Sequence, residues 1–163
     1  MPCGAAPLWQ GPWQNHPMQA YLALTADDLG RTAPPTRDAL LLDPADVPEG
    51  GSWDDVSEDA RAEAGILSLE LARQEETTPT RLVASATLAK GKTRVETWAQ
   101  VDSLYVDDVR GRELCAQICV TEDQDEADAL VEELLAESLM WFDSGERGDL
   151  GRLLLGTETI DEV

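Results

Sequence analysis

Residues 81–88, RLVASATL, are the stretch that decides the predicted fold. Leucine and alanine stand at every second position, with valine, serine and threonine between them, which is the period of a strand with one buried face. Residues 89–92, AKGK, form a tight polar turn in which glycine is available for a positive φ. Residues 94–106, RVETWAQVDSLYV, are rich in β-branched and aromatic residues, so the sequence predicts a β-hairpin across this turn.

Upstream of the hairpin, the sequence predicts one strand and one helix. Residues 19–25, QAYLALT, form a short apolar strand. Residues 31–55 contain four prolines and a Gly-Gly pair, which indicates a long connection with one brief strand or helical turn at the apolar residues 39–42. A capping-box spacing begins at Asp55 and opens an apolar stripe of helical period, which predicts a helix to about Gln74.

Downstream of the hairpin, the sequence predicts two helices and a short final turn. The first helix is capped by the aspartates at 107–108 and ends near Cys119. The second begins with a capping-box spacing at Thr121, and its apolar stripe continues to Phe142. Glycines then end this helix, and residues 150–155 pack back as a short turn.

The order β-α-β-β-α-α predicts an α+β fold, a small and mainly antiparallel sheet with helices on one face. If the first strand joins the hairpin through a right-handed crossover, the topology is related to the ferredoxin-like fold without its last strand. We expect a single α+β domain at 18–155, after a flexible Pro- and Trp-containing tail at 1–17 and before an acidic C-terminal tail at 156–163. A second interpretation of residues 1–17 is that they are an upstream extension and that translation begins at Met18, which directly precedes the first strand.

The charge of the chain restricts its partners and its compartment. The 163 residues include 33 Asp or Glu and 12 Lys or Arg, for a formal net charge of −21. This charge repels nucleic acid and anionic bilayers, so we expect neither direct nucleic-acid binding nor membrane binding. The sequence shows no apolar stretch of membrane-spanning length and no signal-peptide pattern, and its three cysteines are an odd number. We therefore expect a cytoplasmic protein in a reducing compartment.

The chemistry-bearing residues do not form a recognisable catalytic or metal-binding set. Cys115 and Cys119 share a helical face, but a soft-metal site needs further ligands, and the only histidine, His16, lies in the tail. We interpret both thiols as small buried hydrophobes. Residues 121–128 resemble a calcium loop in their acidity, but Ala127 occupies the position that requires glycine. The sequence therefore predicts no catalytic residue, no metal site and no cofactor, and it favours a protein that is not an enzyme.

The acidic residues are concentrated in the last third of the chain. Residues 107–163 hold 17 acids and four bases, which gives a net charge of −13. The acids predicted to lie on the outer face of the second helix are Glu126, Asp128, Glu132, Glu133 and Glu137. This acidic helical face predicts a non-catalytic interaction or regulatory domain that binds a protein with a basic surface, although the charge alone is also consistent with a role in solubility.

Two other functions fit the sequence. One is a small-ligand-binding or enzymatic domain with a pocket between the first helix and the sheet, near Trp98 and Tyr105. The other is a structural homodimer that forms through an exposed strand edge, because a small sheet has two edges to protect.

Three short motifs carry a resemblance to a known family. They are YLALTADDL at 21–29, LYVDD at 104–108 and LMWFD at 139–143, the last followed by Glu146 and Leu150. In these motifs the sequence resembles a family of small acidic, Ala-rich proteins of unknown function from high-GC Gram-positive bacteria. The match covers about residues 18–155, and the tail before Met18 departs from the usual start of the family. The resemblance implies no activity and no catalytic residues.

Overall fold

The computed structural model describes residues 17–156, so the predicted tails at 1–17 and 156–163 lie outside it except for Pro17 and Gly156. The strands are β1 (Met18–Ala23), β2 (Leu40–Leu42), β3 (Leu82–Leu88), β4 (Val101–Asp107) and β5 (Leu139–Asp143). The α-helices are α2 (Trp53–Glu75), α3 (Val109–Val120), α4 (Gln124–Leu135) and α5 (Arg147–Leu154). Short 3-10 turns form η1 (Ala26–Gly30), η2 (Pro44–Asp46), η3 (Trp98–Gln100) and η4 (Ser144–Glu146).

The strands form one five-stranded sheet in the order β2-β1-β3-β4-β5, and each neighbouring pair is antiparallel. The central strand is β3, which the alternation at 81–88 predicts, and six of its seven residues are buried. The α+β class and the antiparallel sheet are therefore confirmed. The apolar residues at 39–42 supply β2, the brief strand expected in the long connection.

The ferredoxin-like topology is wrong, because β1 and β3 pair antiparallel, with Met18 opposite Leu88 and Ala23 opposite Val83. The reason lies in β2. This short strand returns the chain to the end of the sheet at which β1 began, and α2 then crosses the sheet once before β3 enters. Without the return through β2, the same helix would deliver β3 parallel to β1.

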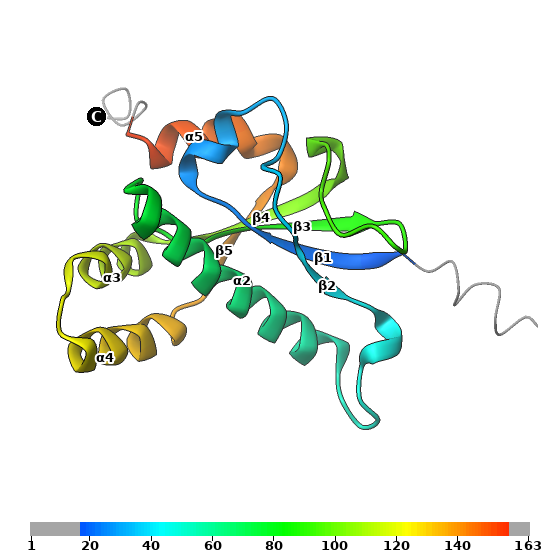
Figure 1. The fold of residues 1–163 in the computed structure, drawn as a ribbon, viewed down its shortest axis with the longest axis horizontal. Helices are drawn as coiled ribbons and strands as arrows, with labels where there is room; N and C mark the ends of the chain where they lie inside the picture. Colours follow the sequence, from blue (N-terminus) through cyan, green and yellow to red (C-terminus); the bar gives the residue numbers. More distant parts are fainter. Residues whose placement is uncertain (1–16, 157–163) are drawn as a thin grey trace, which may run out of the picture.

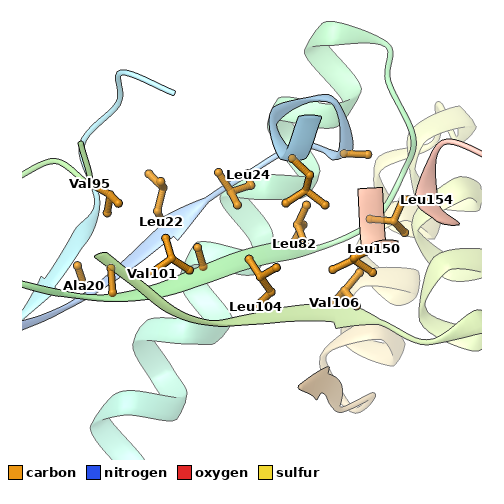
Figure 2. Packing of buried hydrophobic residues seen from close by; sticks show 14 of the residues in the cluster. Ala20, Leu22, Leu24, Leu82, Val95, Val101, Leu104, Val106, Leu150 and Leu154 are labelled. Carbon is orange, nitrogen blue, oxygen red and sulfur yellow. The ribbon is translucent and has the colours of Figure 1, made fainter. Parts of the chain in front are cut away.

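Both faces of the sheet are covered (Figure 1). On one face α2 packs over Tyr21 and Val83, and α3 and α4 join α2 through a second apolar cluster around Leu114. On the other face, η1 and α5 cover the large core, as Figure 2 shows for Leu150 and Leu154 of α5. The expectation of helices on one face thus holds for the three longer helices, while the sequence did not indicate the cover on the opposite face.

Two predicted elements have different bounds in the structure: one begins later than predicted and the other ends earlier. The second hairpin strand starts at Val101 rather than Arg94, because η3 occupies the preceding residues and is closed by a reciprocal cap between Thr97 and Gln100. The predicted second long helix ends at Leu135, and residues 139–143 form β5 instead of its last turn. Pairing of β5 with β4 determines this conformation, so the apolar spacing that continued the helical stripe was misleading.

Helix α2 is tied to the sheet by a buried serine. The Ser68 hydroxyl donates a hydrogen bond to the Leu24 carbonyl (2.6 Å) and accepts one from the Leu82 amide (2.8 Å). Ser68 is fully buried, so water cannot replace either bond. The hydroxyl thereby connects α2 both to the residue that follows β1 and to the first residue of β3.

We predict that Ser68→Ala lowers the free energy of unfolding by about 1–3 kcal/mol, because it leaves a buried carbonyl and amide without this partner. Urea unfolding followed by circular dichroism measures the change. Ser57→Ala is the matched control, since the buried Ser57 hydroxyl has no hydrogen-bond partner among the described residues, and its loss should change stability by less than 1 kcal/mol. Equal effects of the two substitutions would contradict the assigned role of Ser68.

Candidate functional site

A buried ion pair joins the start of β3 to the end of β4. The Arg81 side chain is 3% exposed and Asp107 is 1% exposed. Arg81 Nη2 donates to Asp107 Oδ1 (2.6 Å), and Arg81 Nε lies 3.1 and 3.2 Å from the two carboxylate oxygens. The Arg81 backbone amide donates to Asp107 Oδ2 (2.8 Å). The guanidinium and the carboxylate therefore satisfy each other through several charge-assisted bonds.

Neighbouring elements complete this ion pair. Arg81 Nη2 also donates to the carbonyl of Glu137 (3.1 Å), which lies between α4 and β5. On the other side, the Cys115 thiol donates to Asp107 Oδ2 (3.2 Å). Helix α3 approaches so closely that a Cβ on Gly111 would lie 2.3 Å from Asp107 Oδ1, so glycine is needed at this position. The sequence pattern indicates Asp107 only as part of a helix cap, but Asp108 is the residue that caps α3.

A pocket of about 600 Å³ lies beside this ion pair, between α2 and the sheet. Arg61 lies over the ring of Tyr105, 4.7 Å from its centroid, and no carboxylate lies within ion-pair distance of Arg61 among the described residues. The lining residues are Glu58, Asp59, Arg61, Ala62, Arg81, Tyr105, Leu135, Ala136, Glu137, Ser138 and Leu139. The pocket thus combines an apolar wall with charges of both signs.

The expectation that Trp98 and Tyr105 share one pocket is wrong, because the two rings belong to opposite faces of the sheet. Tyr105 packs in the cluster beneath α2. Trp98 packs against the large core, where its Nε1 donates to the Arg31 carbonyl (2.9 Å) and Arg147 lies 4.4 Å from its ring centroid.

The carboxylates at the pocket do not form an acid–base pair. Glu58 and Asp59 are exposed, and such groups keep water as their main partner. Asp107 is buried near the pocket, but its oxygens already accept hydrogen bonds from Arg81 and Cys115. General acid–base catalysis needs a carboxyl group that can exchange a proton with a substrate, and the half-buried Glu137 is the remaining carboxylate of the pocket lining.

The five predicted partner-binding acids are divided between two places. Glu126, Asp128 and Glu132 are exposed on α4, and no basic side chain of the described chain lies within ion-pair distance of them. Glu133 forms an ion pair with Arg110 of α3. Glu137 lies beyond the end of α4 and lines the pocket, so the structure does not place it on the helical face.

The prediction of a buried thiol is confirmed for Cys115, whereas Cys119 is only half-buried. Cys115 is fully buried, and Cys119 packs against the same apolar cluster at the edge of a smaller hollow of about 250 Å³. Burial raises the pKa of Cys115, and the negative charge of Asp107 raises it further. Burial also raises the pKa of Cys119, although Arg73 offsets part of the effect. Within residues 17–156, no three His, Cys, Asp or Glu side chains gather as a metal site.

Comparison of the chain with models of known protein families, with curated proteins and with solved structures finds no match. Among the described helices, none has both the length and the apolar character that crossing a bilayer requires.

We predict that Asp107→Asn lowers the free energy of unfolding by about 3–5 kcal/mol, because it leaves the Arg81 charge buried without a counter-ion. Chemical unfolding measures the loss. Asp108→Asn removes the same charge one residue away, and it should be nearly neutral because asparagine is an equally good helix cap. A loss below 1 kcal/mol for Asp107→Asn would show that the ion pair does not support the fold.

We also predict that iodoacetamide at about pH 8 does not modify Cys115 in the folded protein and modifies Cys119 more slowly than a free cysteine. A raised pKa lowers the fraction of reactive thiolate at a given pH, and burial restricts access. The rate at Cys119 should therefore increase as the pH rises above the ordinary thiol pKa. Mass spectrometry of the separate peptides measures each site, and unfolded protein is the control in which both react equally fast.

Proposed function

We propose that the protein is a non-catalytic cytoplasmic interaction or regulatory module that presents an acidic face to a basic surface of a partner protein. The observation that carries this proposal is the set of exposed carboxylates on α4, of which Asp128 and Glu132, four residues apart, share one side of the helix. Glu126, Asp128 and Glu132 lie on one helix with no basic side chain of the described chain paired to them. Carboxylates that are not neutralised within the chain remain available to lysine and arginine side chains of a partner.

An acidic face attracts a basic partner over a distance that depends on the salt concentration. Exposed charges of one sign attract a partner of opposite sign over about 10 Å at ordinary ionic strength, and they increase the association rate more than they lengthen the life of the complex. The net charge of −21 extends this attraction beyond the helix itself. Binding through this face should therefore weaken as the salt concentration rises.

A second candidate function is binding of a small molecule in the pocket between α2 and the sheet. Its volume of about 600 Å³ falls within the range of ligand sites. Arg61 and Tyr105 at its wall provide a cation and an aromatic ring for recognition. The exposed acids at the rim of the pocket support this candidate less. Carboxylates that take part in catalysis are normally desolvated, and these are not.

We predict that the triple charge reversal Glu126→Lys, Asp128→Lys and Glu132→Lys weakens binding of the natural partner about tenfold or more at low salt, because like charges then face each other. The partner is first obtained by affinity capture with wild-type protein from cells that produce it, and the affinity is then measured with purified components at two salt concentrations.

The matched control reverses Asp46, Glu49 and Glu96, which changes the net charge equally. These exposed residues lie in the connections before α2 and before β4, away from α4 (Figure 1). The control should reduce binding only slightly. Equal losses for the two variants would mean that total charge, and not the α4 face, determines binding, and an unchanged affinity for the α4 variant would contradict the proposal.

A further inference from the structure

Strand β5 forms an edge of the sheet. It pairs with β4 on one side, and no described residue pairs with it as a strand on the other. An edge strand directs a row of backbone N–H and C=O groups outward, which is a template for a further strand. The opposite edge, β2, has only three residues, whereas β5 has five.

Apart from Asp143 at its last position, the sequence of β5 lacks the features that normally protect an edge. Its five residues, LMWFD, include no lysine and no proline, and its register with β4 runs without a bulge. Met140 is 38% exposed and Trp141 is 58% exposed, so both side chains are only partly covered by the described chain. Proteins that do not use an edge for binding commonly block it with a charge, a proline or a bulge.

Acidic side chains lie at both ends of this strand. Glu58, Asp59 and Glu137 form an acidic rim of the pocket to which Leu139 at the start of β5 also belongs, and these carboxylates outnumber Arg61, which lies in the same pocket over Tyr105. At the other end, Asp143 and Glu146 form the reciprocal cap of η4. A second copy of this chain, with its own charge of −21, would bring like charges together here. The charge of the surroundings therefore favours a basic segment over a homodimer.

The two faces of β5 differ in what they offer. Trp141 lies opposite Tyr105 and donates from Nε1 to the Ser103 hydroxyl (2.8 Å), so its ring lies along the α2 side of the sheet. This side holds the pocket and its acidic rim, and an exposed aromatic ring also attracts cations. Met140 and Phe142 belong to the other side, where Phe142 packs against the large core. That side is apolar.

We propose that β5 accepts an extended segment of the partner protein as a sixth strand of the sheet. The segment carries basic side chains at alternate positions, which face Trp141 and the acidic rim, and apolar side chains between them, which pack beside Met140. Backbone hydrogen bonds supply affinity in such strand addition, and the alternating side chains supply specificity. This inference rests on the proposed function, since it names the form of the basic partner.

The test selects binders from a displayed library of random dodecapeptides against the full chain. Enriched peptides should alternate basic and apolar residues. Each enriched peptide is then synthesised in two versions, with N-methyl groups on the odd-numbered or on the even-numbered residues. Alternate amides of a strand point to the same side, so only one version loses the N–H groups that would bond to β5. We expect one version to lower the affinity about tenfold or more and the other to leave it nearly unchanged.

Two protein variants locate the site. Met140→Lys places a cation on the edge and should lower peptide affinity about tenfold or more, by repelling the basic segment and blocking the edge. Val120→Lys is the matched control, because Val120 is 78% exposed at the end of α3 and the charge change is the same. Circular dichroism confirms that both variants fold, and sedimentation of the wild-type chain measures self-association.

Each outcome decides between alternatives. Strand addition is overturned if no peptide is enriched, if neither N-methylated version loses affinity, or if Met140→Lys binds like Val120→Lys. A wild-type dimer that Met140→Lys dissociates would also overturn it, since a second copy would then occupy the edge.

If the α4 charge reversal weakens binding of the natural partner while Met140→Lys does not, the acidic-face function stands and strand addition falls. If neither variant affects that partner, both fall.

Discussion

The ion pair between Arg81 and Asp107 is the interaction on which the arrangement of this fold depends. Moving two charges out of water costs several kcal/mol, so such a pair persists only where its bonds are complete. Here the backbone amide of Arg81, the thiol of Cys115 and the carbonyl of Glu137 complete them. The pair therefore joins β3, the consecutive elements β4 and α3, and the segment that leads into β5, which are three separate regions of the sequence.

This interior arrangement determines what the surface can do. Because Arg81 holds the Glu137 carbonyl, it positions the start of β5 beside the pocket and along the open edge of the sheet. The buried Cys115 thiol donates a hydrogen bond to the buried Asp107 carboxylate, so both groups stabilise the fold. The groups that face outward are carboxylates, an arginine stacked on a tyrosine, and an apolar edge strand. These groups suit recognition of another molecule.

The acidic face of α4 and the edge of β5 contribute different properties to such recognition. Long-range charge increases the rate of encounter but specifies the partner only loosely. Backbone pairing at a strand edge acts over a few ångströms and fixes both the direction and the register of a bound segment. The turn at residues 136–138 connects α4 directly to β5, so both features belong to consecutive elements of the chain.

Sequence alone determined the elements whose signals are local. Alternation predicted β3, apolar spacing predicted α2, and aspartate caps predicted the start of α3, because neighbouring residues carry each of these patterns. Tertiary structure decided the rest. Residues 139–143 continue a helical stripe in sequence yet form β5, since pairing with β4 outweighs local propensity. The Arg81–Asp107 pair joins residues 26 positions apart, and no local pattern distinguishes these two charges from the others. The antiparallel entry of β3 likewise followed from the three residues of β2, whose effect on chain direction exists only once the sheet has formed.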